Sequence, residues 1–315
     1  MSSSHSPSRA TKPVALVVGA SRGIGRQVAI DLAKNGYAVI VAAKSITPLS
    51  ALVNLNPFPP DPNSQLSTIT TVAREIQLLG GDATAIAVDT TSYSSIQSLV
   101  FGAVQTYGRL DVVVYNSGAI WWGPVSTTPM KRFQLMQRVN VEGLYGIIQE
   151  TLPHLRRTSG RIVVVCPPIY NRFFRGKTAY AIGKVGMSVL VQGLGMDFVR
   201  EGRGMGIVGI WPAVAIESAA TEQFTKKDPE YAKQLRKPDI FSDAILAMLE
   251  APVEEINGKL ELDEDFLRRY KRVKDFDKYS VVPGSNPKRI MPLILPDLTV
   301  EEQNDEGMRA DSSKL

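Results

Sequence analysis

The chain has 315 residues, which is long enough for one large α/β domain or two small ones. Its 44% of hydrophobic and 21% of charged residues are ordinary values for a soluble protein. The net charge of +5 is mild and no dense block of Lys or Arg occurs, so we predict no nucleic-acid-binding face. The one cysteine, Cys166, excludes an internal disulfide and a thiolate metal cluster, and His5 and His154 make a poor metal site.

The first segments of the chain predict a tail followed by a buried strand. Residues 1–11 lack the apolar stretch of a secretory signal and are expected to be a flexible tail. Residues 12–19 (KPVALVVG) are rich in Val, as in a parallel strand that is buried on both faces. No apolar run in the chain approaches the roughly 20 residues of a membrane span, so we predict none.

A glycine turn and a helical pattern follow this strand directly. Glycines allow a ligand to approach the backbone closely, and the N-terminus of a helix presents free N–H groups and a positive dipole end. Strand, glycine turn and helix in succession therefore predict a binding site for the pyrophosphate of a dinucleotide. The residues of this turn are Gly19, Ser21, Arg22, Gly23, Ile24 and Gly25.

The second strand, residues 37–43, indicates which dinucleotide is bound. Enzymes selective for NAD place an Asp or Glu near the end of this strand, whereas a basic group there accommodates the 2′-phosphate of NADP. Here the strand is followed by Lys44, and Arg22 could reach the same region. We therefore predict NADP(H) in preference to NAD(H). The alternative is that both residues are surface cations without a partner.

Between this strand and the next helix the chain is rich in proline, which excludes a regular helix or a central strand. We expect residues 45–66 to form a surface insertion. The prolines are Pro48, Pro57, Pro59, Pro60 and Pro62.

Strands and helices alternate along the rest of the chain. Further strands are predicted at residues 83–88, 110–115, 161–165, 206–211 and 258–262, and helices at 68–79, 96–107, 130–150, 178–200 and 239–250. This alternation predicts an α/β fold: a single doubly wound Rossmann-type parallel sheet with helices on both faces. The polar segment 213–236 has the mixed composition of a lid, and residues 266–315 are expected to form a C-terminal appendage.

Tyr180 and Lys184 stand out at the start of the predicted helix 178–200. Residues at i and i+4 lie on one face of a helix, so the phenol and the amine can converge on one point. A cation beside a Tyr favours the phenolate and lowers its pKa toward the working range. The alternative is a Tyr packed beneath a solvated Lys.

Asp89, after the third strand, can bond an adenine edge or simply cap the next helix.

Taken together, these motifs resemble those of the short-chain dehydrogenase/reductase family over residues 12–265. The resemblance implies hydride transfer between a nicotinamide and a carbonyl or alcohol carbon. It implies that Tyr180 donates or accepts the proton, that Lys184 holds the nicotinamide ribose and lowers the pKa of Tyr180, and that Asn140 fixes a water. The implied cofactor-binding residues are Gly19, Ser21, Arg22, Gly23, Ile24, Gly25, Lys44, Asp89, Asn116, Gly118, Tyr180, Lys184 and Pro212.

Two positions depart from the family pattern. Pro167 stands where the family has a Ser that hydrogen-bonds the reacting oxygen, and Ala213 replaces the usual Gly. Losing such a donor costs about a hundred- to a thousandfold in rate if nothing replaces it. Tyr170, a substrate hydroxyl or a bound water could supply the bond. The alternative function is a catalytically weak nucleotide-binding protein, used for sensing or assembly.

The last three residues, Ser313, Lys314 and Leu315, match the peroxisomal address read by the import receptor. We therefore expect a peroxisomal oxidoreductase that acts on a lipid-derived, acyl-CoA-like or polyketide-like substrate. No metal is predicted, and the family resemblance suggests a homodimer or homotetramer.

Overall fold

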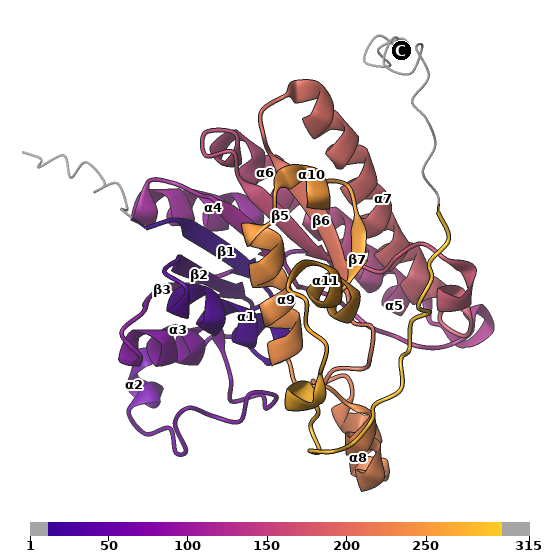
Figure 1. Ribbon diagram of the computed structural model, residues 1–315. Coiled ribbons are helices and arrows are strands. Elements are labelled where there is room, and N and C mark those ends of the chain that lie inside the picture. Colours follow the sequence, from indigo (N-terminus) through magenta and orange to yellow (C-terminus); the bar gives the residue numbers. More distant parts are fainter. Residues whose placement is uncertain (1–11, 298–315) are drawn as a thin grey trace, which may run out of the picture.

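The computed structural model describes residues 12–297 and contains one parallel sheet (Figure 1). The seven strands are ordered β3-β2-β1-β4-β5-β6-β7, and all six neighbouring pairs are parallel. This arrangement confirms the predicted α/β fold class. The strands are β1 (Val14–Val18), β2 (Ala38–Ala43), β3 (Asp82–Ala87), β4 (Val112–Tyr115), β5 (Arg161–Val165), β6 (Gly206–Trp211) and β7 (Leu260–Leu262).

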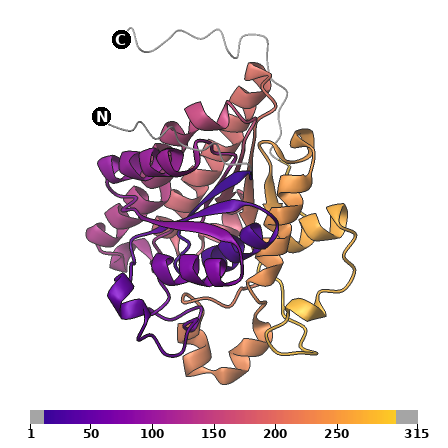
Figure 2. The ribbon, with the colours of Figure 1, turned by 90° about the vertical axis from the view of Figure 1, so that its left-hand side faces the viewer.

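Helices cover both faces of the sheet, and each face has its own hydrophobic core (Figures 1 and 2). Successive strand residues point to opposite faces, so Val17 joins one core and Leu16 joins the other. The first face carries α1 (Gly23–Lys34), α3 (Ile69–Leu78), α9 (Asp239–Glu250) and α11 (Asp263–Tyr270). The second carries α4 (Tyr93–Tyr107), α6 (Gly143–Leu155) and α7 (Thr178–Glu201).

The helix predicted over residues 130–150 is interrupted. It consists of α5 (Met130–Gln137), the π-helix η2 (Arg138–Glu142) and then α6. The Tyr115 hydroxyl donates a hydrogen bond of 2.5 Å to the carbonyl of Val139 inside this π-helix. The buried phenol thus pairs with a carbonyl at the point where the helical pattern widens.

Short helical turns occupy several connections. The insertion contains a one-turn helix, α2 (Leu49–Leu52), which corrects the prediction that no regular helix occurs there. The other turns are α8 (Glu222–Lys227), α10 (Val253–Ile256), η1 (Val125–Thr127), η3 (Asn171–Phe174), η4 (Pro229–Gln234) and η5 (Asp277–Tyr279). The segment with α8 and η4 lies where the sequence predicts a lid.

The C-terminal part of the described chain packs onto the sheet domain. The boundary predicted at residue 265 falls inside α11, and Phe266, Leu267, Phe276 and Tyr279 belong to the core on the first face. Residues 271–297 then run back along the molecule (yellow in Figure 1). The predicted N-terminal tail, 1–11, and the tripeptide Ser313 to Leu315 lie outside the described residues.

Within the described chain, α7 meets the length and composition of a membrane-spanning helix, in contrast to the prediction that no segment does. The core helix of a soluble protein can have the same length and composition. In this structure α7 packs against β6 and β7 and carries the buried Lys184.

Candidate active site

The glycine turn between β1 and α1 packs directly against the loop that follows β4. A Cβ atom on Gly19, whose φ is +88°, would lie 2.6 Å from the backbone nitrogen of Ser117. A Cβ atom on Gly25 would lie 2.1 Å from the carbonyl oxygen of Gly19. Asn116 joins the two loops, since its Nδ2 donates to the Gly19 carbonyl at 3.0 Å.

The start of α1 is suited to a phosphate group. The N-cap residue, Arg22, has extended backbone and makes no side-chain capping bond, and the first turn holds no carboxylate. The N–H of Gly23 already donates to the Pro62 carbonyl at 2.9 Å, so the later N–H groups of the turn are the ones that a phosphate would use. Gly23 has a φ of +53°, a conformation that favours glycine. These residues fit the pyrophosphate of a dinucleotide, as the sequence predicts.

Lys44 and Asp89 meet at the ends of β2 and β3. Lys44 Nζ lies 2.8 Å from Asp89 Oδ2, so this lysine has a partner within the chain. The hydrogen bond from Lys44 lowers the pKa of Asp89 to about 2, with Thr91 contributing further bonds. Because the Lys44 side chain is 67% exposed, the ion pair is weak and can be exchanged for another anion.

Tyr180 and Lys184 lie on the first two turns of α7, and only 4% of the surface of Tyr180 and 3% of that of Lys184 are exposed. Lys184 Nζ donates to the carbonyl of Val165, at the end of β5, over 2.8 Å. It also lies 3.5 Å from the position that a Cβ atom of Gly118 would occupy. A Cβ atom at residue 118 would therefore lie in ordinary van der Waals contact with the amine.

Burial shifts the pKa values of both groups. It raises the pKa of Tyr180, opposite to the lowering expected from a neighbouring cation. It lowers the pKa of Lys184 to about 8, because an ammonium ion is poorly solvated there. The amine bonds to Val165, so the expected influence of Lys184 on Tyr180 is outweighed by desolvation of the phenol.

Asn140 lies in the π-helix η2 and is fully buried. Its Oδ1 accepts from the backbone nitrogen of Ala119 at 2.9 Å, and its Nδ2 donates to the carbonyl of Ala119 at 3.2 Å. Its Oδ1 is also 3.5 Å from the Cβ position of Gly118, next to Lys184. The structure thus brings together Asn140, Gly118 and Lys184, from three separate elements.

Aromatic side chains that the sequence analysis did not select surround this group. The ring centroids of Phe173 and Tyr180 are 6.2 Å apart. The Phe173 ring also meets the Trp211 ring edge-on, with a centroid distance of 5.6 Å. Lys184 Nζ lies 5.5 Å from the centroid of Trp211. The position of Trp211, directly before Pro212 at the end of β6, was the available signal. These rings therefore lie beside the phenol and the amine.

At the position of the missing serine, Pro167 presents an acceptor instead of a donor. Its carbonyl accepts a bond of 2.6 Å from the hydroxyl of Ser188, which also lies 3.2 Å from the Lys184 carbonyl. Cys166 is fully buried, and burial raises the pKa of its thiol to about 12, as expected for a packed thiol. The Tyr170 hydroxyl, packed beside the Tyr180 cluster, bonds to Met291 Sδ at 3.7 Å.

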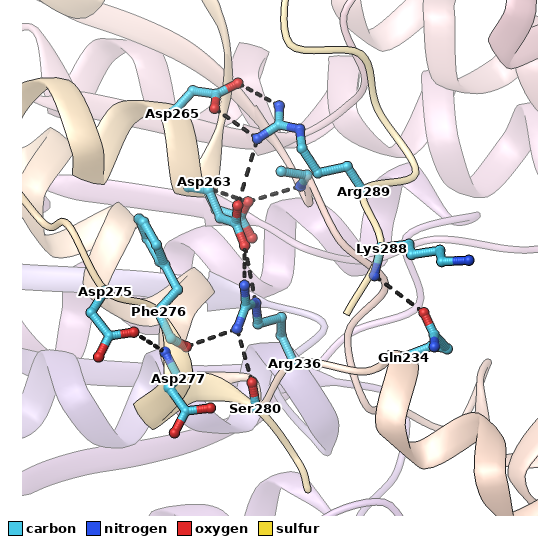
Figure 3. A network of polar contacts seen from close by, with 12 residues as sticks. Gln234, Arg236, Asp263, Asp265, Asp275, Phe276, Asp277, Ser280, Lys288 and Arg289 are labelled. Atoms are coloured by element: carbon cyan, nitrogen blue, oxygen red, sulfur yellow. Dashed lines mark hydrogen bonds and ion pairs between the residues drawn. The ribbon is translucent and has the colours of Figure 1, made fainter. Parts of the chain in front are cut away.

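The loop after Pro212 is held by the C-terminal segment through a buried polar network (Figure 3). Asp263 Oδ1 accepts from the backbone nitrogen of Ala213 at 2.8 Å, and the Ala213 carbonyl accepts from Ile290 at 2.8 Å. Arg236 pairs with Glu264 at 2.8 Å, and Arg289 makes two bonds to Asp265, of 2.8 and 2.7 Å. The C-terminal segment thus holds the backbone at Ala213, next to Pro212.

Asp263 predicts a pH-dependent stability. Burial raises the pKa of its carboxyl group to about 7, from about 4 in an unfolded chain. Its contribution to stability is complete below about pH 4 and is lost as the pH rises through 7. Asp263→Asn keeps an acceptor for Ala213. As the pH rises from 5 to 8, we expect its free energy of unfolding to increase by about 1–3 kcal/mol relative to that of the wild type. Thermal unfolding of both proteins at pH 5 and pH 8 measures this difference, and an equal change of stability in the two proteins would contradict the prediction.

The structure does not suggest a metal centre: no group of three or more His, Cys, Asp or Glu side chains within residues 12–297 could hold an ion. The candidate site comprises the glycine turn, the buried side chains of Tyr180 and Lys184, and the aromatic rings beside them.

Comparison with known proteins identifies the family. The sequence model of the short chain dehydrogenase family matches residues 13–56 and 63–228. Hydroxysteroid dehydrogenase-like protein 2 of Danio rerio is 35% identical over 294 residues, which are 92% of this chain and 64% of that protein. The chain thus spans less than two thirds of that relative.

Solved structures agree with this result. A short chain dehydrogenase from Mycobacterium thermoresistibile has a TM-score of 0.75 and 31% identity, covering 88% of this chain and 93% of that one. A 7α-hydroxysteroid dehydrogenase complexed with NADH and 7-oxo glycochenodeoxycholic acid has a TM-score of 0.62 and 25% identity. The match covers 81% of this chain and 93% of that one. The predicted resemblance is confirmed, and this chain belongs to the short-chain dehydrogenase/reductase family of oxidoreductases.

Proposed function

We propose that this protein is an NADP(H)-dependent oxidoreductase that transfers a hydride between the nicotinamide and a carbonyl or hydroxyl carbon. The observation that carries the proposal is that Lys184, one helical turn after the buried Tyr180, meets Asn140 and Gly118 in the loop that packs on the glycine turn. The substrate class that we propose is lipid-derived, acyl-CoA-like or polyketide-like, in line with the mainly apolar and aromatic surroundings of Tyr180.

In this mechanism the dinucleotide, when bound, supplies or accepts the hydride. Tyr180 gives a proton to the substrate oxygen during reduction, or removes it during oxidation. Lys184 holds the nicotinamide ribose, while Asn140 positions a water that connects Lys184 with solvent. The residues that would hold the dinucleotide are Gly19, Ser21, Arg22, Gly23, Ile24, Gly25, Lys44, Asp89, Asn116, Gly118 and Pro212.

The preference for NADP(H) rests on Lys44 and Arg22 and on the absence of an acid at residue 44 or 45. The related steroid dehydrogenase was solved with NADH, so relatives of this chain also use the other dinucleotide. We expect NADPH to bind at least about tenfold more tightly than NADH, a gap of about 1.4 kcal/mol. Fluorescence titration of the purified protein measures both affinities, and Lys44→Ala should reduce the gap.

Turnover is then tested with a panel of ketones, hydroxy acids and acyl-CoA compounds. Oxidation of NADPH by at least one carbonyl substrate is expected. Failure to bind either dinucleotide would reject the proposed function. Tight binding without turnover on any substrate would favour the second candidate, a catalytically weak nucleotide-binding protein, for which Pro167 is the specific observation.

Two further proposals concern location and assembly. The tripeptide Ser313 to Leu315 supports import into peroxisomes by the import receptor, and deleting it in the expressed chain should leave the protein in the cytosol. The exposed apolar side chains Ile182, Val189 and Val199 on α7 support a homodimer or homotetramer. Light scattering of the purified protein measures the mass, and a monomer would reject this assembly.

A further inference from the structure

The positive charge of the chain is concentrated in two segments that lead to residues of the candidate site. Residues 116–140, from the end of β4 to Asn140, and residues 166–184, from the end of β5 to Lys184, together contain seven Lys or Arg residues and no Asp or Glu. The whole chain has a net charge of +5, so all other residues together carry a net charge of −2. The excess of positive charge therefore belongs to the segments next to Tyr180.

The other side of the site has no such excess. The segment after β6, residues 213–236, holds four acids and four cations. A cavity of about 590 Å³ lies between this segment and the insertion, and four carboxylates and one cation line it, those of Asp61, Glu217, Glu222, Asp239 and Lys237. In Figure 1 the insertion, marked by α2, and α5 lie on opposite sides of the molecule. A negatively charged group of a substrate is thus repelled on the insertion side and attracted on the α5 side.

Two of the cations lie over aromatic rings of the cluster that contains Tyr180. Lys177 Nζ is 4.3 Å from the centroid of the Phe173 ring. The guanidinium carbon of Arg132 is 4.9 Å from the centroid of the Trp121 ring. Phe173 and Trp121 both pack in the hydrophobic cluster of Tyr180, so the two cations border that cluster.

Neither cation is neutralised within the described part of the chain. No carboxylate of residues 12–297 forms an ion pair with Arg132 or Lys177. Lys177 is the N-cap residue of α7, where the positive end of the helix dipole makes a cation unfavourable. Burial lowers the pKa of its amine, because a half-buried ammonium ion is poorly solvated. A bound anion would relieve both effects.

We propose that the substrate carries a carboxylate or phosphate group that binds Lys177 and Arg132, while its apolar part packs on the aromatic cluster beside Tyr180. The inference rests on the proposed function, because it names the substrate class of the same site. Lys and Arg are the side chains that bind carboxylates and phosphates in proteins. An amphiphilic anion fits the cations and the rings together, whereas an uncharged sterol or ketone would leave both cations unpaired.

Calorimetric titration of the full chain, with and without NADPH, tests this proposal with three probes that share a ten-carbon chain. Decanoate carries a carboxylate, decanoyl-CoA carries phosphates, and decanol has no charge. We expect at least one of the two anions to bind about tenfold or more tightly than decanol, with a smaller preference at high salt. The tighter of the two anions identifies the charged group as carboxylate or phosphate.

Variants assign the preference to the two cations. Lys177→Gln is expected to raise the Kd of the tighter anion about tenfold and that of decanol or NADPH less than about twofold. Arg132→Gln should act in the same direction, by about threefold, and Lys177→Arg, which keeps the charge, should retain most of the preference. Lys34→Gln removes an exposed cation at the end of α1 and is the matched control, with no change in any Kd.

The outcomes separate this inference from the proposed function. Failure of the protein to bind a dinucleotide would reject the proposed function, and the probes can still be compared in the free protein. If neither anion binds, if decanol binds as tightly as both, or if Lys177→Gln weakens all three probes equally, the inference is wrong while the proposed function stands. Thermal unfolding of each variant checks that weaker binding does not come from loss of the fold.

Discussion

Tyr180→Phe is expected to lower turnover by at least about a thousandfold while changing the Kd for NADPH less than about threefold. The substitution removes the hydroxyl group and keeps the buried ring that packs near Phe173. A positioned acid or base contributes typically about a hundred- to ten-thousandfold to the rate. Single-turnover kinetics with NADPH and the best substrate of the panel measure the chemical step, and titration measures the Kd.

Tyr170→Phe is the matched control, because it makes the same change in the same aromatic cluster. The Tyr170 hydroxyl bonds to Met291 Sδ, a weak acceptor, and we expect its removal to cost no more than about tenfold in rate. If Tyr180→Phe retains more than a tenth of the wild-type turnover, the role assigned to Tyr180 is wrong. If it loses NADPH binding as well, the residue is structural.

The parts of the site that the sequence could predict are local. The glycine turn is a contiguous stretch between a Val-rich strand and a helix, and Tyr180 and Lys184 are one helical turn apart. In both cases backbone periodicity alone fixes which groups lie on one side. The same logic predicted the fold class, because alternating strands and helices leave few possible arrangements.

The parts that could not be predicted depend on contacts between distant residues. The π-helix at Asn140 involves Tyr115, which is 24 positions before its partner Val139. The bond from Gly23 to Pro62 crosses an irregular segment whose path no periodicity describes. The prediction of a lowered pKa for Tyr180 was wrong for a related reason. Burial raises this pKa, and the degree of burial is a property of the whole packed site.

The C-terminal segment provides the second large prediction. Glu264→Ala is expected to destabilise the protein by about 3–5 kcal/mol, since it leaves the charge of Arg236 buried without its carboxylate partner. Only 8% of Arg236 and 4% of Glu264 are exposed, and Glu264 also lies 3.5 Å from Arg289. A loss of this size lowers the Tm of a chain of this length by roughly 5–15 °C. Calorimetry of the purified variants measures it.

Two further variants show how much of the loss of stability comes from the unpaired buried charge and how much from the loss of side-chain volume. Glu230→Ala removes the partner of Lys233 in an exposed pair and should change the stability by no more than about 1 kcal/mol. Replacing Arg236 with Met and Glu264 with Leu together should recover most of the loss, because no unpaired charge then remains. If the double variant is as unstable as Glu264→Ala, the bonds of Arg236 to Ser280 and the Phe276 carbonyl hold the segment in place, and the ion pair does not.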